Sequence, residues 1–465
     1  MSVRSVGIIG AGQAGFQTAA SLRQDGFDGQ IALIGDELGV PYQRPPLSKA
    51  YLLGKIGLDS LRFRPEMYFA AHRIELVHER AVAIDRANRR VKLKSGSSVA
   101  YDHLVLAVGA HNRALPVPGA NLAGVLGLRT LADADELAVR LKHARDVVVV
   151  GAGFIGLEFA AVASALGALV RVLELADRPM PRAVSVETSR VFARAHEAWG
   201  VRLDFGQAVA RIHGRDGAVD HVETTDGRSL PAELVVFGIG VLPNVSLASE
   251  AGLDIENGIR VGSNLLTSDL AISAIGDCAS FPNPHSGELI RLESVQNATD
   301  QARAVSARIL GKPGPYISVP WFWTEQRDLK LQIVGLSSGY DTAVALGNPE
   351  AGSTSVLCFR TGRLVAVESV NRPIDHMIAR RVLARPTPAL SPIDAAAPGF
   401  DLKAWEAASK TAPRRPAIPS GAELMEPKAH SALSMPGPEA TLRLAEFAAK
   451  RAAKVTPAPS HDEQR

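Results

Sequence analysis

Hydrophobic and polar positions along the chain follow two periods, and their order marks a repeated unit. Residues 5–9 form a short apolar run that ends in glycine, which predicts a buried parallel strand. Residues 14–24 then place apolar side chains at helical spacing, and residues 30–34 form a second apolar run. This strand–helix–strand order has the length expected for a right-handed crossover.

The same unit returns in the middle of the chain. We expect a strand at 146–150, a helix at 157–166 and a strand at 168–174. Shorter apolar or alternating runs predict further strands, which are expected at 90–94, 103–108, 202–205, 221–225 and 233–237. Two copies of one unit indicate two related α/β layers.

The C-terminal part of the chain has another pattern. Residues 355–359 and 364–370 alternate or run apolar and predict a small antiparallel sheet, with a helix following at 378–383. From about residue 412 onward, prolines interrupt a stretch rich in Ala, Ser and Lys, which predicts a largely disordered tail. One segment of this tail, 439–454, has a weakly amphipathic helical pattern.

Composition and charge narrow the class of protein. The 465 residues are enough for about three domains. A hydrophobic fraction of 46% and a charged fraction of 21% are ordinary for a globular protein. A formal net charge of +3 argues against general nucleic-acid binding. Since no apolar run suits a membrane span or a signal peptide, we expect no membrane and a cytoplasmic location.

The first repeated unit carries the sequence GAGQAG between its strand and its helix. Gly10 makes the tight turn, Gly12 lets a pyrophosphate approach the backbone, and Gly15 packs the helix against the strand, with Ala14 inside the motif. Asp36 ends the second strand at the distance expected for hydrogen bonds to a ribose. A purely structural glycine turn is the alternative, but strand, helix and acid in register favour a dinucleotide site.

The second unit repeats this fingerprint as GAGFIG. Its nucleotide-binding positions are Gly151, Gly153, Ile155 and Gly156. Glu174 closes the following strand, where a carboxylate pairs with a 2′-hydroxyl and repels a 2′-phosphate, so NAD is favoured over NADP. Arg178 lies nearby and weakens that preference, because an arginine accommodates a phosphate. Two fingerprints in one chain predict that a bound and a diffusing dinucleotide meet.

The two cysteines exclude several other chemistries. Cys278 and Cys358 lie far apart and form no CxxC or CxxxxC pair, so we expect no vicinal redox disulfide. They also leave no cluster for zinc or an iron–sulfur centre, and we expect no metal site. The interpretation that fits both is an inert buried thiol.

With the segment PYQRPPLSK at residues 41–49, these motifs resemble the FAD-dependent NADH:ferredoxin reductases of oxygenase systems, which are glutathione-reductase-like flavoproteins. The resemblance covers about residues 6–405. It implies an α/β fold with two Rossmann-like dinucleotide-binding domains, for FAD and NAD, plus a small C-terminal α+β domain. The implied domains are FAD-binding at 1–115 and 247–322, NAD-binding at 116–246, C-terminal at 323–405 and an Ala/Pro-rich tail at 406–465.

The resemblance also implies which residues hold the cofactors. Pro46 and Lys49 would lie against the flavin, although a rigid loop with a surface lysine is the alternative. Gly240, in the segment GIGVLPN, resembles the position that passes the nicotinamide. The remaining FAD positions of the family correspond to Val82, Arg129, Asp277, Val295 and Trp323. For the aromatic stretch around Trp323, ordinary interdomain packing stays open as a second interpretation.

The mechanism implied by the family needs no nucleophile or general base. NADH would pass a hydride to the bound FAD, and the protein would supply positioning and electrostatics. We expect Lys49 to stabilise negative charge on the reduced flavin. Glu158 matches the family's partner for that lysine and for the nicotinamide carboxamide, and a purely structural buried carboxylate is the alternative.

The electron acceptor implied by the family is a small [2Fe-2S] ferredoxin that feeds a cytochrome P450 or a ring-hydroxylating dioxygenase. Such partners are acidic, so a basic docking patch is expected, although each arginine alone could be a solvated surface charge. The candidates are Arg291, Arg303, Arg372, Arg380 and Arg381. We expect a monomer or weak homodimer. The alternatives are another NAD(P)H-dependent flavin oxidoreductase, or a redox-controlled binding flavoprotein like apoptosis-inducing factor.

Overall fold

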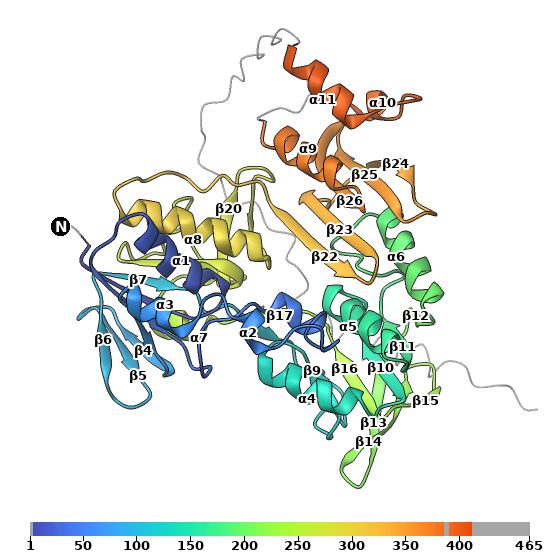
Figure 1. Cartoon of the computed structure of the whole chain (residues 1–465), viewed down its shortest axis with the longest axis horizontal. Coiled ribbons are helices and arrows are strands. Elements are labelled where there is room, and N and C mark those ends of the chain that lie inside the picture. Colours follow the sequence, from blue (N-terminus) through green and yellow to red (C-terminus); the bar gives the residue numbers. More distant parts are fainter. Residues whose placement is uncertain (1–2, 386–389, 412–465) are drawn as a thin grey trace, which may run out of the picture. The chain divides into compact units, whose positions relative to one another are not determined.

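The computed structural model describes residues 3–385 and 390–411, which form a mixed α/β structure (Figure 1). Two five-stranded parallel sheets and one five-stranded antiparallel sheet organise these residues. The predicted fold class is therefore confirmed. The helical segment predicted at 439–454 lies outside the described residues, as does the rest of the tail beyond 411. In the described chain no helix combines the length and apolarity needed to cross a membrane.

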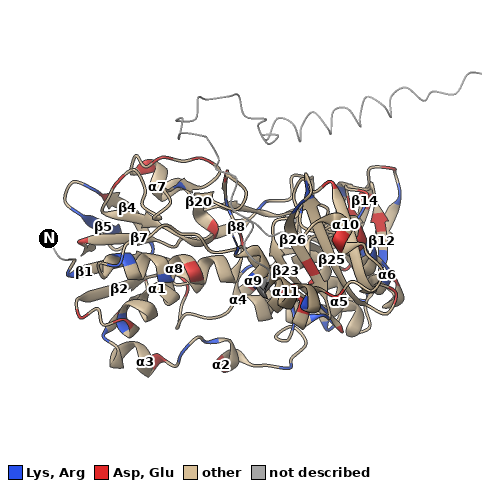
Figure 2. Cartoon of the chain, turned by 90° about the horizontal axis from the view of Figure 1, so that it is seen from above, with Lys and Arg blue, Asp and Glu red and all other residues tan. Residues whose placement is uncertain are grey.

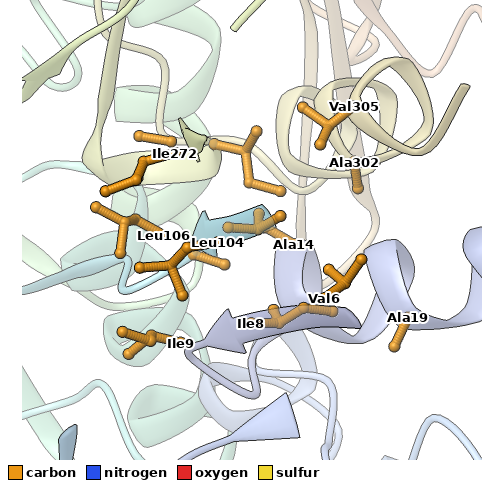
Figure 3. Close-up of a cluster of buried hydrophobic side chains, with 14 of the residues drawn as sticks. Val6, Ile8, Ile9, Ala14, Ala19, Leu104, Leu106, Ile272, Ala302 and Val305 are labelled. Atoms are coloured by element: carbon orange, nitrogen blue, oxygen red, sulfur yellow. The ribbon is translucent and has the colours of Figure 1, made fainter. Parts of the chain in front are cut away.

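The first parallel sheet contains the first repeated unit. Its strands, in spatial order, are β19 (Ile272–Ala274), β7 (His103–Leu106), β1 (Ser5–Ile9), β2 (Gln30–Ile34) and β3 (Ile74–Val77). The helices α1 (Gln13–Gln24) and α8 (Val295–Ile309) lie side by side on it (Figure 1). Figure 3 shows the core between them, where Ile8, Leu104 and Val305 are fully buried. Strands β1 and β2 have the predicted bounds.

The second parallel sheet contains the second repeated unit. Its strands are β12 (Arg202–Phe205), β11 (Leu169–Glu174), β10 (Asp146–Val150), β16 (Leu234–Phe237) and β9 (Val125–Gly127). The helices around it are α4 (Leu131–Leu141), α5 (Phe154–Ala165) and α6 (Val186–Ala198). α5 begins three residues before the predicted helix, because the helix starts inside the glycine motif itself. This helix is apolar on all sides and is buried along most of its length.

Two short strands mark where the chain passes between the parallel sheets. β8 (Ala110–Asn112) leaves the first sheet, β17 (Val241–Pro243) returns to it, and the two pair in antiparallel fashion. The smaller sheets are β4 (Ala81–Asp85) with β5 (Arg90–Leu93) and β6 (Ser98–Ala100), β13 (Val209–Arg215) with β14 (Ala218–Thr224) and β15 (Ser229–Pro231), and β18 (Ile259–Arg260) with β20 (Ala279–Asn283) and β21 (Glu288–Ile290). The short helices are η1 (Pro45–Ser48), α2 (Leu58–Leu61), α3 (Glu66–Ala71), α7 (Ser246–Glu250) and η2 (Gly276–Cys278).

The antiparallel sheet lies in the C-terminal part of the chain, as predicted. Its order is β22 (Trp321–Gln326), β23 (Leu329–Gly335), β26 (Arg363–Val370), β25 (Ser353–Arg360) and β24 (Thr342–Asn348). α9 (Pro373–Leu383) packs on it, followed by α10 (Pro392–Ala395) and α11 (Leu402–Thr411). α9 begins five residues earlier than predicted, at a proline whose fixed φ suits the first helical position.

The start of the predicted tail needs a correction. Residues 406–411 belong to α11, and Glu406 is buried with its carboxylate facing Arg381 and Arg385. These ion pairs, together with the packing of Leu402 and Trp405 in the C-terminal core, hold the helix against α9. Figure 2 shows that acidic and basic residues are interspersed along the described chain, in keeping with its small net charge.

Candidate active site

The first glycine turn joins β1 to α1 and leaves open space at one position. Gly10 has a φ of +105°, and a Cβ there would lie 2.2 Å from the carbonyl oxygen of Ala107. A Cβ on Gly15 would lie 1.8 Å from the Gly10 oxygen, so the chain itself requires both glycines. A Cβ on Gly12 would meet nothing within 4 Å. Because no side chain caps the start of α1, its N–H groups face this space, and a pyrophosphate fits there.

The second glycine turn, between β10 and α5, repeats this geometry. Gly151 has a φ of +100°, and a Cβ on Gly156 would lie 2.1 Å from the Gly151 oxygen. A Cβ on Gly153 would come no closer than 3.6 Å to the carbonyl oxygen of Gly238. The start of α5 also lacks a side-chain cap, and Ile155 in its first turn is 41% exposed. The middle glycine again faces space that a diphosphate can occupy.

Glu174 lies at the end of β11, beside this second turn. Its carboxylate accepts hydrogen bonds from the backbone N–H of Ala152 at 2.7 Å and of Ala176 at 2.9 Å. These bonds fix the carboxylate next to the glycine motif, and each oxygen keeps a lone pair for a ribose hydroxyl. The structure thus brings the predicted acid and the predicted glycines together.

The first site places its acid differently. The backbone N–H of Gly10 bonds to Ile34, as that of Gly151 bonds to Leu173, so Gly35 occupies the position equivalent to Glu174. A Cβ on Gly35 would lie 2.8 Å from the Cβ of Ala11, which leaves no room for a side chain. The acid therefore comes one residue later, as Asp36, which is more than half exposed and pairs with Arg80 at 3.3 Å. The two predicted nucleotide sites are related but not identical.

Two arginines follow Glu174 in the sequence, and the structure separates their roles. The Arg178 guanidinium donates to the carbonyl oxygens of Pro181 at 3.1 Å and Val184 at 3.4 Å, so it braces the loop after β11. A guanidinium nitrogen of Arg182 lies 3.6 Å from the place of a Cβ on Gly240. Gly240 has a φ of +99° and precedes β17, where the nicotinamide was predicted. Sequence reasoning missed Arg182, because its position across the turn depends on the fold.

Lys49 and Glu158 form a buried ion pair. The Lys49 Nζ lies 2.7 Å from Glu158 Oε2, with the glutamate 3% exposed and the lysine 21% exposed. The Ser48 hydroxyl donates to the same carboxylate oxygen, and the Thr324 hydroxyl donates to Oε1 at 2.5 Å. Lys49 follows η1, Glu158 lies on α5 and Thr324 on β22, so three separate parts of the fold meet at one carboxylate. Sequence reasoning missed Ser48 and Thr324, because their meeting with Glu158 depends on the packing of segments far apart in the chain.

The loop that carries Lys49 is held by its own polar residues. The Tyr42 hydroxyl and the Arg44 guanidinium both donate to the carboxylate of Glu37. Arg44 also donates to the backbone oxygen of Arg129 at 2.8 Å, and Tyr42 accepts from the N–H of Leu131 at 3.0 Å. Burial raises the pKa of Tyr42 to about 12, so its hydroxyl stays a donor. The loop is thereby fixed before any ligand binds.

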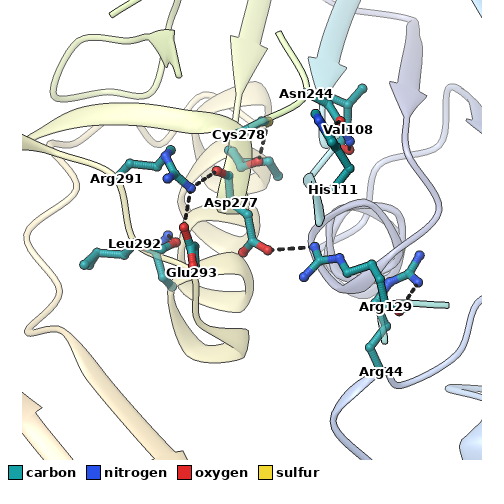
Figure 4. A network of polar contacts seen from close by, with 12 residues as sticks. Arg44, Val108, His111, Arg129, Asn244, Asp277, Cys278, Arg291, Leu292 and Glu293 are labelled. Carbon is teal, nitrogen blue, oxygen red and sulfur yellow. Dashed lines mark hydrogen bonds and ion pairs between the residues drawn. The ribbon is translucent and has the colours of Figure 1, made fainter. Parts of the chain in front are cut away.

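Arg129 and Asp277 are predicted flavin residues that contact each other (Figure 4). The Arg129 guanidinium lies 2.9 Å from Asp277 Oδ2, across 148 positions of sequence. Arg291 donates to the backbone oxygen of Asp277 at 3.1 Å and pairs with Glu293 at 2.7 Å. Asp277 therefore lies between two guanidinium groups, in η2, which follows β19 of the first parallel sheet.

An aromatic stretch links the C-terminal sheet to both parallel layers. The rings of Trp321 and Trp323 in β22 lie 5.5 Å apart between centroids. Phe322 packs against Phe154 at the start of α5, at 4.4 Å. The hydroxyl of Ser294, which caps α8 just before Val295, donates to the backbone oxygen of Trp321. The structure thus brings Val295 and Trp323 to the same region, while Val82 lies in β4 and is 44% exposed.

Both cysteines are buried free thiols, which confirms that part of the prediction. Burial raises the pKa of Cys278 to about 11 and raises the pKa of Cys358 above its usual range. Cys278 donates weakly to backbone carbonyl oxygens of Leu106 and Ile275. A thiol that stays protonated in the core is not a redox nucleophile.

Comparison with known proteins identifies the class. Residues 4–302 match the family described as pyridine nucleotide-disulphide oxidoreductase, and residues 321–405 match a reductase C-terminal domain. The chain therefore belongs to the pyridine nucleotide-disulphide oxidoreductase family. It is an FAD-dependent oxidoreductase that uses NAD(H), and the unobstructed approach to the backbone at Gly12 and Gly153 suits the diphosphates of both cofactors.

Individual relatives extend the match over almost the whole described chain. Rhodocoxin reductase of Rhodococcus erythropolis is 52% identical over 86% of this chain and 93% of its own. The structure of a ferredoxin reductase for the CYP199A2 system of Rhodopseudomonas palustris matches with a TM-score of 0.85 and 50% identity, covering 87% of this chain and all of that one. The covalent putidaredoxin reductase–putidaredoxin complex also gives a TM-score of 0.85, at 37% identity over 89% of this chain and all of that one.

Proposed function

We propose that this protein is an NADH:ferredoxin reductase that delivers single electrons to a [2Fe-2S] ferredoxin serving a cytochrome P450 or a ring-hydroxylating dioxygenase. The observation that carries the proposal is the Lys49–Glu158 pair, which lies where the first glycine domain, the second and the C-terminal sheet meet. A charge pair at this junction suits a reaction between two bound dinucleotides. When bound, the flavin takes a hydride from NADH and releases electrons one at a time.

Different residues of this chain bind the two cofactors and stabilise charge at the flavin. Gly12 and Gly153 leave the space for two pyrophosphates, and Glu174 orients the ribose of NADH. The Lys49 ammonium, also bonded to the Pro45 carbonyl at 3.1 Å, supplies fixed positive charge where the reduced flavin gains negative charge. Glu158 holds that ammonium in place. Glu174 favours NADH over NADPH. Arg178 does not favour NADPH by binding a 2′-phosphate, because its guanidinium is bonded to backbone carbonyls.

The buried thiols support an external one-electron acceptor, because they do not accept the electrons themselves. In the described chain both cysteines are buried and unpaired, so neither takes electrons from the flavin. The names of the relatives point the same way: one is a ferredoxin reductase for the CYP199A2 system, and another is joined covalently to putidaredoxin. Free thiols also support our placement of the protein in the cytoplasm.

Of the five arginines predicted to form a basic docking patch, two remain the better candidates. Arg291, Arg372 and Arg381 pair with carboxylates of their own chain and offer less charge to a partner; those carboxylates belong to Glu293, Asp375 and Glu406. The Arg303 side chain is 61% exposed, and its ion pair with Asp300 is long at 3.8 Å. Arg380 lies 5.0 Å from the ring centroid of Trp321. We place the ferredoxin on the surface that includes Arg303 and Arg380.

The surroundings of Arg303 support this placement. It lines a cleft of about 460 Å³ together with Arg23 and Arg64, and among the residues that the structure describes no carboxylate lines that cleft. α8 connects the two arginines of the proposed surface, because its capping residue bonds to Trp321 and Arg303 lies two turns further along. An acidic ferredoxin would complement this charge.

The test is a two-step anaerobic reaction of the flavin-loaded protein. NADH is added first, and an oxidised [2Fe-2S] ferredoxin second, while the flavin absorbance is recorded. Bleaching by NADH followed by rapid recovery with ferredoxin supports the proposal. Bleaching without recovery contradicts the ferredoxin acceptor and favours a slow redox-controlled binding protein. Bleaching by NADPH but not by NADH contradicts the role assigned to Glu174.

A further inference from the structure

Glu158 lies at the end of a buried hydrogen-bond chain that starts on another helix. His196 Nε2 on α6 lies 2.7 Å from Gln326 Oε1, and Gln326 Nε2 lies 3.4 Å from Thr324 Oγ1. Thr324 Oγ1 in turn lies 2.5 Å from Glu158 Oε1. Each of these four side chains is at least 97% buried. We call His196, Gln326 and Thr324 the Glu158 relay.

The chemistry of the groups gives the relay one direction. The amide oxygen of Gln326 can only accept, so His196 Nε2 carries a proton and donates to it. The amide nitrogen of Gln326 can only donate, so Thr324 Oγ1 accepts from it. Thr324 then has a single hydroxyl proton left, and that proton points at Glu158 Oε1. Every donor of the relay is oriented toward the glutamate.

The state of His196 agrees with this direction. Desolvation by burial, aided by the charge of Arg327, lowers the pKa of His196 to about 4. The ring is therefore neutral near pH 7 and has one N–H, which the bond to Gln326 uses. Its Nδ1 is buried without a hydrogen-bond partner in the described part of the chain, as expected for a ring nitrogen that holds only a lone pair. A neutral histidine makes the orientation of the relay permanent rather than pH-switched.

The two carboxylate oxygens of Glu158 are contacted by donors from different parts of the fold. Oε2 receives Lys49 Nζ and the Ser48 hydroxyl, both from the segment around η1. Oε1 receives the Thr324 hydroxyl from β22. Lys49 is the charged group in contact with the carboxylate, and Arg327 is the charge nearest the far end of the relay. The C-terminal sheet therefore contributes a hydroxyl to a charge pair that otherwise belongs to the two nucleotide folds.

We propose that Thr324, oriented by Gln326 and His196, is a positioning residue that keeps Glu158 ionised and aimed at Lys49. This inference rests on the proposed function, in which Lys49 serves the reduced flavin. Without the Thr324 proton, one oxygen of a buried carboxylate loses its donor. Burial then favours the protonated acid, which no longer holds the ammonium by charge. The C-terminal sheet thereby acts on the reaction site through one hydroxyl.

The test uses the flavin-loaded protein and the variants Thr324→Val, Thr324→Ser and Gln326→Met. Stopped-flow mixing with NADH between pH 5 and 9 gives the rate of flavin reduction. For Thr324→Val we expect the acid limb of the profile to move up by about one pH unit, so that the rate is up to about tenfold slower on that limb and little changed on the plateau. Gln326→Met should move the acid limb in the same direction by less. Thr324→Ser should leave the acid limb at its wild-type position.

A matched control separates positioning from packing. Thr354 is a buried threonine of the same antiparallel sheet that donates to the Leu346 carbonyl. Thr354→Val should lower the melting temperature without moving the pH profile. An unmoved profile in Thr324→Val, or an equal movement in Thr354→Val, overturns the proposal.

A second readout needs no turnover. The infrared band of a protonated carboxyl, identified by its loss in Glu158→Gln variants, should appear at higher pH in Thr324→Val than in the wild type. Equal pH dependence of this band in both proteins overturns the relay. If NADH fails to reduce the wild-type flavin, the proposed function fails, and the infrared comparison still decides the relay.

Discussion

Glu368 in β26 accepts three hydrogen bonds from Ser185, the residue that caps α6. The backbone N–H of Ser185 lies 2.9 and 3.0 Å from the two carboxylate oxygens, and its hydroxyl lies 2.6 Å from Oε2. Both residues are fully buried. One carboxylate thus joins a helix of the second parallel layer to the C-terminal sheet.

The burial of Glu368 predicts a pH-dependent stability. Desolvation raises the pKa of its carboxyl above the usual value of 4.5, although the hydrogen bonds from Ser185 oppose this shift. A raised folded-state pKa adds stability below about pH 4.5, and this stability is lost as pH rises through the folded-state value. We expect the melting temperature of Glu368→Gln, relative to that of the wild type, to increase as pH rises from 4.5 to 8. A temperature difference that stays constant over this range contradicts the prediction.

The two kinds of glycine in the first turn predict opposite effects. Gly12→Ala adds a methyl group to open space, so the protein should fold with nearly unchanged stability but lose most of its flavin. Gly15→Ala places a carbon against a backbone oxygen, so it should lower the melting temperature even of flavin-free protein. Flavin content and calorimetry measure both effects. Full flavin content in Gly12→Ala would show that no phosphate lies there.

The Lys49–Glu158 pair predicts strong coupling. Lys49→Met and Glu158→Gln should each slow flavin reduction by NADH by about 10- to 100-fold, and the double variant should be little worse than either. The exposed pair Arg62–Asp59 is the control, since exposed ion pairs contribute little and Arg62→Met with Asp59→Asn should leave the rate unchanged. Fully additive effects at Lys49 and Glu158 would mean that the two residues act independently.

Glu174 predicts the choice of nicotinamide cofactor. Glu174→Ala should weaken NADH binding and narrow the preference for NADH over NADPH by about tenfold, because the carboxylate no longer binds the ribose or repels a phosphate. Glu197→Ala, which changes an exposed acid on α6, is the charge-matched control. Titration of NADH and NADPH followed by flavin reduction measures both preferences. An unchanged ratio in Glu174→Ala would assign the selectivity elsewhere, with Arg182 as the first residue to test.

The proposed docking surface predicts that its variants weaken only the reaction with ferredoxin and not the reduction of the flavin by NADH. Arg303→Glu and Arg380→Glu should raise the KM for ferredoxin by about tenfold, and added salt should narrow the difference from wild type. Reduction of ferricyanide by NADH should not change. Arg211→Glu, on the exposed strand β13, makes the same charge change at a distance from α8 and α9. An equal loss in Arg211→Glu would mean that net charge, and not this surface, sets the affinity.

Much of the fold was predictable because local pattern dictates it. The strands β1, β2, β10 and β12 have the bounds expected from their apolar runs. Buried parallel strands need continuous apolar residues, and their turns need glycine where backbone atoms nearly touch. α8 was not predicted, because its buried face includes polar residues such as Asn297 and Gln301, whose partners lie outside the helix.

The sequence by itself determined the two glycine turns, their acids and the absence of a cysteine pair, since each depends on residues close together in the chain. Only the tertiary structure decided that Lys49, Glu158 and Thr324 meet, that Asp277 lies between Arg129 and Arg291, and which candidate arginines pair closely with carboxylates of their own chain. The contacts of Glu158 with Lys49 and Thr324, and of Arg129 with Asp277, join segments more than 100 residues apart. Their geometry is set by how whole sheets pack, and no local pattern encodes it.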